Sequence, residues 1–225
     1  PELRCARTVR PFFVVALLKA IQAWDRLCLA RLVRRHPGLV IDPSASSNLA
    51  RARFDLAPGA RLRIGPGVRV ERQRDGVRFC VARGGDVVIG EGVWLRSELE
   101  PVHLAVFEGA RLEIGANAFL NGCHLSAKES VTLGEYAMIG PGSRVFDSDQ
   151  HPLDDANPEA REAVSIGAFA WVAADVTLLK GARIGAHSVI GARSVVGGEI
   201  PAHSLAFGIP ARVRGTVGDR SRHPF

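Results

Sequence analysis

Hydrophobic positions recur at every sixth residue along the last third of the chain. From Ile166 to Val196 an aliphatic side chain occupies each sixth position, and a mostly small residue follows four places after each one. A helix repeats its buried face every 3.6 residues and a strand every two, so a period of six fits neither. It is typical of a parallel β-helix, in which each hexad forms one short strand and one corner, and three hexads close a triangular coil.

An aliphatic-glycine dipeptide marks the coils further upstream. It begins at positions 64, 89, 114, 133, 166 and 184, so the successive spacings are 25, 25, 19, 33 and 18 residues. A coil of three hexads needs 18 residues, so the early coils bulge and an excursion of 15 residues follows the coil of Leu133. This excursion lies in residues 147–164, "DSDQHPLDDANPEAREAV". Since long loops on rigid scaffolds are usually functional, we expect a functional loop here.

Residues 10–35 carry apolar side chains at helical spacing, beginning near Pro11 and ending before Pro37. They predict one amphipathic helix that packs against the rest of the protein or a partner subunit. Docking on a membrane is the alternative, because basic residues flank a very apolar first turn. The predicted organisation is therefore a helical segment (1–38), a β-helix domain (39–215) and a C-terminal tail (216–225).

Composition supports a β fold with many corners, since hydrophobic residues make up 47% of the chain and glycines number 24. The cysteines form no C-x-x-C pair, which argues against a disulfide framework and favours a reducing, cytoplasmic setting. A net charge of +6 suits nucleic acid, an anionic membrane surface or a phosphate-bearing ligand. Without a basic cluster or aromatic stacking positions, nucleic acid is not expected. No apolar run is long enough to span a bilayer, so we expect a protein that is soluble or peripheral to the inner membrane.

The second half of the chain resembles a known family. The stretches "LGEYAMIGPGSRVFDSDQHP" and "IGAFAWVAADVTLLKGARIGAHSVIGARSVVGGEIPAHSLAFGIPARVRG" are similar to hexapeptide-repeat acyltransferases of the maltose and galactoside O-acetyltransferase branch, including its surface-polysaccharide relatives. The resemblance covers roughly residues 109–215. It implies a left-handed parallel β-helix, a homotrimer with active sites at the subunit clefts, acetyl-CoA as donor and a sugar hydroxyl as acceptor.

His151 is the first candidate for chemistry, because a neutral imidazole can remove the proton of an attacking hydroxyl. The resemblance makes this "H-P" histidine the general base, and a surface histidine in a polar loop is the alternative. Asp147 and Asp149 precede it and either orient the imidazole or are simply solvated. Asn121 falls where galactoside-type enzymes bind the acceptor hydroxyl, although an asparagine at a coil corner would look the same.

The resemblance also assigns residues to the donor. Trp171 would lie beside the pantetheine arm, or alternatively cover a subunit interface, and the backbone N–H of Ala174 would point toward the thioester oxygen. Ala192 and Gly197 would lie against the cofactor. Arg212, in "GIPAR", would bind phosphate, which suits the geometry of a guanidinium.

Three other functions account for parts of the sequence. A γ-type carbonic anhydrase would use three histidines across a subunit interface, but "IGAHSVIGARSV" holds one histidine, so no metal is expected. N-acetylation of an amino sugar or nucleotide sugar is the alternative within the family, and a non-enzymatic scaffold would leave the His151 loop unexplained. Cys123 is interpreted as a core thiol, and His187 and His203 as ordinary surface residues.

Overall fold

The computed structural model describes residues 11–222, with side chains from Val14 onward. The first ten residues of the predicted helical segment, Cys5 among them, and the last three residues of the predicted tail lie outside the described part.

Three sheets of parallel strands form the faces of a triangular prism. Sheet A contains β1 (Leu39–Ile41), β3 (Arg61–Ile64), β6 (Asp86–Ile89), β9 (Arg111–Ile114), β12 (Ser130–Leu133), β15 (Val164–Ile166), β18 (Arg183–Ile184) and β21 (Glu199–Ile200). Sheet B contains β2 (Arg53–Leu56), β5 (Val77–Val81), β8 (Val102–Val106), β11 (His124–Ala127), β14 (Arg144–Phe146), β17 (Thr177–Leu178) and β20 (Val195–Val196). Sheet C contains β4 (Arg69–Val70), β7 (Trp94–Arg96), β10 (Phe119–Asn121), β13 (Met138–Ile139), β16 (Trp171–Val172), β19 (Val189–Ile190), β22 (Ser204–Gly208) and the antiparallel β23 (Ala211–Thr216).

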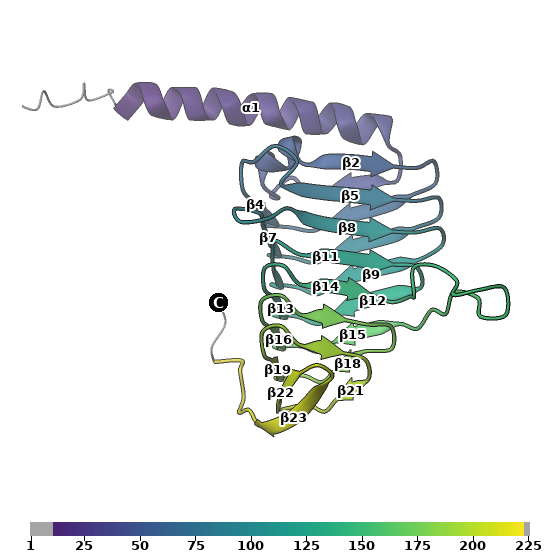
Figure 1. Cartoon of the computed structure of the whole chain (residues 1–225). Coiled ribbons are helices and arrows are strands. Elements are labelled where there is room, and N and C mark those ends of the chain that lie inside the picture. Colours follow the sequence, from purple (N-terminus) through teal and green to yellow (C-terminus); the bar gives the residue numbers. More distant parts are fainter. Residues whose placement is uncertain (1–10, 223–225) are drawn as a thin grey trace, which may run out of the picture.

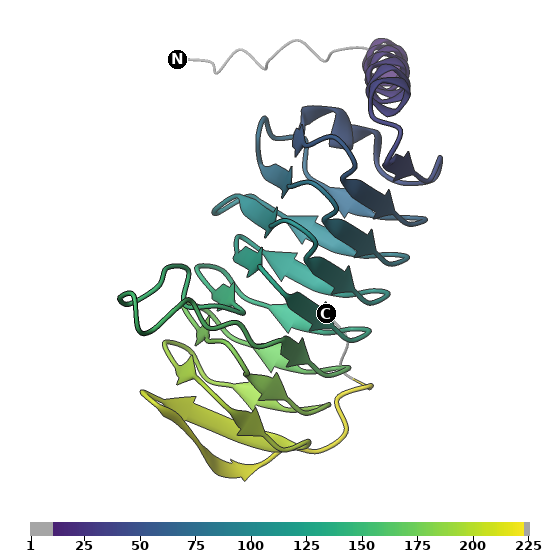
Figure 2. The same cartoon turned by 90° about the vertical axis from the view of Figure 1, so that its right-hand side faces the viewer.

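The chain visits the sheets in the order A, C, B and then returns to A, one coil further along the axis. Followed from the α1 end, this path is a left-handed coil (Figure 1). The predicted fold class, a left-handed parallel β-helix of hexads with an N-terminal helix, is confirmed. Residues 147–163 leave the prism at the edge between sheets B and A, where they stand out from the coils (Figures 1 and 2).

The sixfold hydrophobic repeat fills the interior of the prism. The aliphatic residues at positions 166, 172, 178, 184, 190 and 196 are all at most 3% exposed. The small residues that follow them, such as Ala170 and Ser188, are buried as well. Because each strand is in register with its neighbours, equivalent residues form ladders along the axis, with Leu133 beside Ile166 and Ile166 beside Ile184.

The glycine of each aliphatic-glycine marker has a packing reason. At Gly65 an added Cβ would lie 2.8 Å from the carbonyl oxygen of Ile89, and at Gly115 it would lie 2.6 Å from the Glu135 nitrogen. In both cases the obstacle is the backbone of the next coil, which cannot move without opening the stack. The aliphatic-glycine dipeptide therefore lies where successive coils come closest, at the corner after sheet A.

Helix α1 (Pro11–Arg35) lies across the first coil, against the 3-10 helix η1 (Ser47–Arg51) (Figure 1). The C-terminal half of α1 makes this contact: Leu29 is 5% exposed, and Asp25, 1% exposed, is paired with Arg72. Covering the open end of a solenoid in this way protects its core and sheet edges. No described segment of the helix is long and apolar enough to cross a membrane.

Replacing Gly134 by alanine is expected to destabilise the prism. The new Cβ would lie 2.8 Å from the Cα of Ala168 in the next coil, so the two coils must separate. Overpacking of this kind costs about 1–3 kcal/mol. Gly218→Ala is the matched control, because its new Cβ would have no atom within 4 Å. Thermal unfolding followed by circular dichroism should show a lower Tm for Gly134→Ala only, and equal values for the two variants would contradict this account.

Candidate active site

The base of the loop that carries His151 is held rigidly against the coils. Asp147 is fully buried, and its carboxylate oxygens accept the backbone N–H groups of Lys128 and Glu129, each at 2.8 Å. The carbonyl of Asp147 accepts the N–H of Glu162 at 2.8 Å, so both ends of the loop are tied together. Asp147 is thus the anchor of the loop, and its carboxylate is already occupied by backbone donors.

Lys128 is the second anchor of this loop. Its Nζ donates to the carbonyl of Gln150 at 2.8 Å and forms an ion pair of 2.6 Å with Glu159, and both paired side chains are largely buried. The hydrogen bond from Lys128 lowers the pKa of Glu159. Its Nζ also lies 4.9 Å from the ring centroid of Phe107. Sequence reasoning missed Lys128, because a single lysine at a coil corner carries no signal that connects it with an acidic loop.

His151 projects from this anchored base into solvent. It follows Gln150, whose backbone has a φ of 68° and whose side-chain amide donates to the Ser148 hydroxyl at 2.7 Å. No described residue contacts the His151 ring with a hydrogen bond or ion pair. Asp149, one of the two acids considered for orienting the imidazole, pairs with Lys180 in this structure, and this hydrogen bond lowers the pKa of Asp149. The imidazole therefore stands exposed and available at the edge between sheets B and A.

The residues predicted for the donor lie mainly on a different part of the prism. Trp171 is 39% exposed on β16 of sheet C, and Ala174 and Ala192 occupy corners between sheets C and B. The Ala174 carbonyl accepts the N–H of Arg193 at 3.0 Å, whereas no described residue accepts a hydrogen bond from the Ala174 N–H. Arg212 belongs to β23, also in sheet C. Gly197 follows β20 and lies at the edge between sheets B and A.

Asn121 ends β10, at the edge between sheets C and B, and is 8% exposed. Its side-chain oxygen is buried and has no hydrogen-bond partner among the described residues. Strand β11 separates Asn121 from the corner that anchors the His151 loop. Within one chain, therefore, the structure does not gather His151, Asn121 and the donor residues at one place.

The C-terminal tail lies over Trp171. The guanidinium of Arg220 is 5.4 Å from the Trp171 ring centroid, and its Nε donates to the carbonyl of Phe169 at 3.1 Å. Burial lowers the pKa of Arg220. The backbone N–H of Arg220 donates to Nδ1 of His187 at 3.1 Å. His187 and His203, expected to be ordinary surface residues, instead stack face to face with ring centroids 4.7 Å apart, in a ladder that extends through Phe169.

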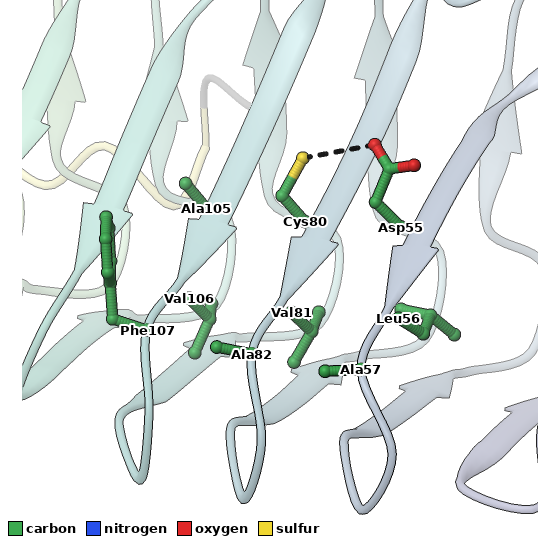
Figure 3. A pocket seen from close by; sticks show the side chains of 9 residues that line it. All are labelled: Asp55, Leu56, Ala57, Cys80, Val81, Ala82, Ala105, Val106 and Phe107. Atoms are coloured by element: carbon green, nitrogen blue, oxygen red, sulfur yellow. Dashed lines mark hydrogen bonds between the residues drawn. The ribbon is translucent and has the colours of Figure 1, made fainter.

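Two hollows lie on the outer surface of sheet B. The first, about 480 Å³, follows the edge with sheet A across three coils and is mostly apolar (Figure 3). Its polar groups are Asp55 and the Cys80 thiol, 3.7 Å apart, and burial together with this acid raises the pKa of Cys80, so the thiol stays protonated. Phe107, at one end of the hollow, also touches Lys128. Cys123 is a buried core thiol whose pKa is raised by burial.

The second hollow, about 510 Å³, lies closer to the edge with sheet C. Its lining includes the side chains of Arg78, Glu100, His103, His124, Arg144 and Phe146. Within residues 11–222, no group of three or more histidine, cysteine, aspartate or glutamate side chains is placed to hold a metal ion.

Comparison with known proteins agrees with this architecture. Residues 163–198 match the family model for the bacterial transferase hexapeptide (six repeats). The chain carries the hexapeptide repeat of bacterial transferases. This confirms the resemblance to the hexapeptide-repeat acyltransferases that the sequence predicted.

Two curated relatives illustrate the similarity of the hexapeptide-repeat chain to named enzymes. It is 36% identical to the putative lipopolysaccharide biosynthesis O-acetyl transferase WbbJ of Escherichia coli strain K12, over 40% of this chain and 52% of that protein. It is 35% identical to the galactoside O-acetyltransferase of Lactococcus lactis, over 40% of this chain and 44% of that protein. The chain thus spans about half the length of the curated relatives it matches.

Among solved structures, the hexapeptide-repeat acetyltransferase VCA0836 of Vibrio cholerae, complexed with acetyl-CoA, has a similar fold. The TM-score is 0.50 at 25% sequence identity, and the match covers 60% of this chain and 72% of that chain.

Proposed function

We propose that this chain is an acetyl-CoA-dependent O-acetyltransferase that modifies a sugar hydroxyl during the biosynthesis of a surface glycan. The observation that carries the proposal is the His151 loop, which interrupts an otherwise regular β-helix and presents a free imidazole at the edge of the prism. The names of the relatives support it, since they include a lipopolysaccharide biosynthesis O-acetyl transferase and a galactoside O-acetyltransferase. In this proposal the catalytic domain is the β-helix of residues 39–215, which includes the catalytic loop 147–164. The helical segment 1–38 precedes this domain, and the tail 216–225 follows it.

The surface of sheet C fits a CoA thioester. The ring of Trp171, which is 39% exposed beside the Arg220 guanidinium, offers an apolar contact for the pantetheine arm. The Ala174 N–H, which has no acceptor among the described residues, is a donor for the thioester oxygen. Ala192, at a corner between sheets C and B, is small and exposed, which leaves room for a long ligand beside the coils. Gly197 is also small and exposed but lies at the edge between sheets B and A, so its predicted contact with the donor would come from another copy. Arg212 supplies a cation for the phosphates.

The chemistry assigned to His151 is that of a general base. Bound acetyl-CoA supplies an acyl group that is activated as a thioester. The imidazole takes the proton of the sugar hydroxyl while the hydroxyl oxygen bonds to the carbonyl carbon, the carbon–sulfur bond breaks, and the proton passes to the leaving sulfur. Asn121 is the proposed contact for the acceptor hydroxyl through its side-chain amide, which can both donate and accept a hydrogen bond. Orientation of the imidazole by Asp147 or Asp149 stays a prediction.

Replacing His151 by alanine should lower kcat by about 10²- to 10⁴-fold, because proton removal in the transition state is lost. Since the donor residues lie on other elements, the affinity for acetyl-CoA and the Tm should hardly change. Acetyl-CoA consumption against a panel of sugars and nucleotide sugars measures kcat, and calorimetry measures the affinity. His36→Ala is the control for loss of a histidine far from the loop. A His151→Ala enzyme that kept a third of the wild-type kcat would remove His151 from the mechanism.

A homotrimer would bring the separated residues together. The His151 loop leaves the edge between sheets B and A, whereas Trp171, Ala174 and Asn121 lie on sheet C or at its edge with sheet B. A copy packed alongside with a parallel axis can place its loop beside these residues, and the cleft between the copies can enclose a long ligand. Light scattering at micromolar concentration should give three times the chain mass of 24.1 kDa. A mass of one chain would contradict the shared site.

The free half of α1 is the proposed contact with an anionic membrane surface on the cytoplasmic side. Its exposed apolar side chains include Leu17 (59%), Leu18 (52%) and Trp24 (57%). Among the described side chains of α1, the only acid is Asp25, which is buried and paired with Arg72, so every exposed charge on this helix is basic. An apolar surface flanked by cations matches the chemistry of anionic lipid.

The chain should sediment with vesicles that contain phosphatidylglycerol and not with vesicles of phosphatidylcholine alone. Leu18→Glu should abolish this binding, because it puts a negative charge into the apolar contact. Val213→Glu is the control, as it changes an exposed valine at the opposite end of the prism (48% exposed). Equal binding by the wild type and the Leu18→Glu variant would exclude α1 as the membrane contact.

A further inference from the structure

The second hollow of sheet B contains a pair of histidines that the proposed chemistry does not use. His103 and His124 occupy equivalent outward positions on the adjacent strands β8 and β11, with ring centroids 4.6 Å apart and rings edge to face. The ring of Phe146, on β14, lies 5.7 Å from that of His124. The three rings together form an aromatic wall that spans three successive coils.

Both imidazoles are neutral at physiological pH. Burial lowers the pKa of His103, and burial with the nearby His103 and Arg144 lowers the pKa of His124 to about 4. A neutral imidazole has one nitrogen that donates and one that accepts a hydrogen bond. Nε2 of His103 lies 3.4 Å from the Cys80 Sγ, which leaves Nδ1 of His103 for a ligand. Such a pair beside an aromatic ring matches the alternating hydroxyls and C–H faces of a pyranose.

Two arginines border the same wall. Among the described residues, neither Arg78 nor Arg144 has a carboxylate within ion-pair distance, and the Nε of Arg78 donates only to the carbonyl of Asp75 at 3.3 Å. This differs from arginines elsewhere on the prism, such as Arg111, which pairs with Glu113 at 2.8 Å. Glu100 is the one acid in the lining of this hollow. With both histidines neutral, the hollow carries a net positive charge.

The hollow adjoins the base of the His151 loop. Along β11, His124 is followed two residues later by Ser126, which points to the same face of the strand, about 6.6 Å further on. The hydroxyl of Ser126 donates to the side-chain oxygen of Gln150 at 3.4 Å, and Gln150 directly precedes His151. At the other end, Gly122 and Cys123 of the lining follow Asn121.

We infer that this hollow is an acceptor subsite that binds a carboxylate-bearing pyranose next to the sugar that receives the acyl group. The inference rests on the proposed function, and it specifies the acceptor as an acidic oligosaccharide or polysaccharide rather than a free neutral sugar. In this subsite Arg78 and Arg144 pair with the sugar carboxylate, His103 and His124 bind its hydroxyls, and Phe146 packs against its apolar face.

The test measures binding without any acyl donor, so that it does not depend on turnover. Protein with nitrogen-labelled histidine is titrated with digalacturonate and, separately, with a neutral galactose disaccharide of the same linkage, and the imidazole resonances are followed by nuclear magnetic resonance. The His103 and His124 signals, assigned with His103→Gln and His124→Gln, should shift with digalacturonate only. Arg144→Gln should weaken digalacturonate binding roughly tenfold, the usual effect of losing a hydrogen bond between charged groups.

Arg111→Gln is the matched control, since it removes an exposed arginine from an outward position on sheet A. Because Arg144 is also exposed, its variant should fold and keep the oligomeric state of the wild type. The inference is overturned if neither histidine signal moves, if the neutral disaccharide binds equally well, or if Arg144→Gln changes the oligomeric state, which would make the hollow a subunit contact. Binding of digalacturonate by a protein that transfers no acyl group would leave the subsite standing and refute only the proposed function.

Discussion

The close stacking of backbone on backbone, coil after coil, is the constraint on which the rest of this structure depends. Parallel strands pair at a spacing of about 4.8 Å, and at the corner after sheet A the next coil comes so near that only glycine fits. Interior positions are then filled by one aliphatic residue per hexad. Since successive coils stack in register, an outward side chain on a paired strand of an inner coil has a neighbour directly above and below it.

This register turns the surface of the prism into ladders of side chains. On one edge the ladder is aromatic, from Tyr136 through Phe169 to His187 and His203, with neighbouring rings about 5 Å apart and nearly parallel. On sheet B neighbouring strands bring together two histidines, a phenylalanine and two arginines that form no ion pair with a described residue. Residues of successive coils, 16 to 33 positions apart in sequence, thus form continuous surfaces that suit extended ligands.

A rigid scaffold also explains how the His151 loop can be both long and well positioned. The loop begins at a fully buried carboxylate, Asp147, that holds two backbone N–H groups of the preceding coil. Lys128 joins its two arms through Gln150 and Glu159. These bonds at the base therefore offset the conformational entropy that is lost when the loop is ordered. The tip of the loop remains free to contact a ligand or a second chain. The prism keeps this loop apart from the donor residues predicted on sheet C, and the proposed homotrimer would bring the two together.

The sequence alone determined the repeat and the fold class, because few folds besides a β-helix bury an aliphatic residue at every sixth position and need a glycine at each tight corner. It also determined the helix near the N-terminus and the existence of an interrupting loop. It also singled out His151, through a short motif in that loop. Only the tertiary structure showed that Asp147 accepts backbone N–H groups and that Asp149 pairs with Lys180. It also showed that Lys128 holds the His151 loop, that Arg220 lies over Trp171, and that His103 and His124 lie edge to face. These roles depend on which coils and edges become neighbours, and a repeat with variable insertions does not reveal that register until the chain is folded.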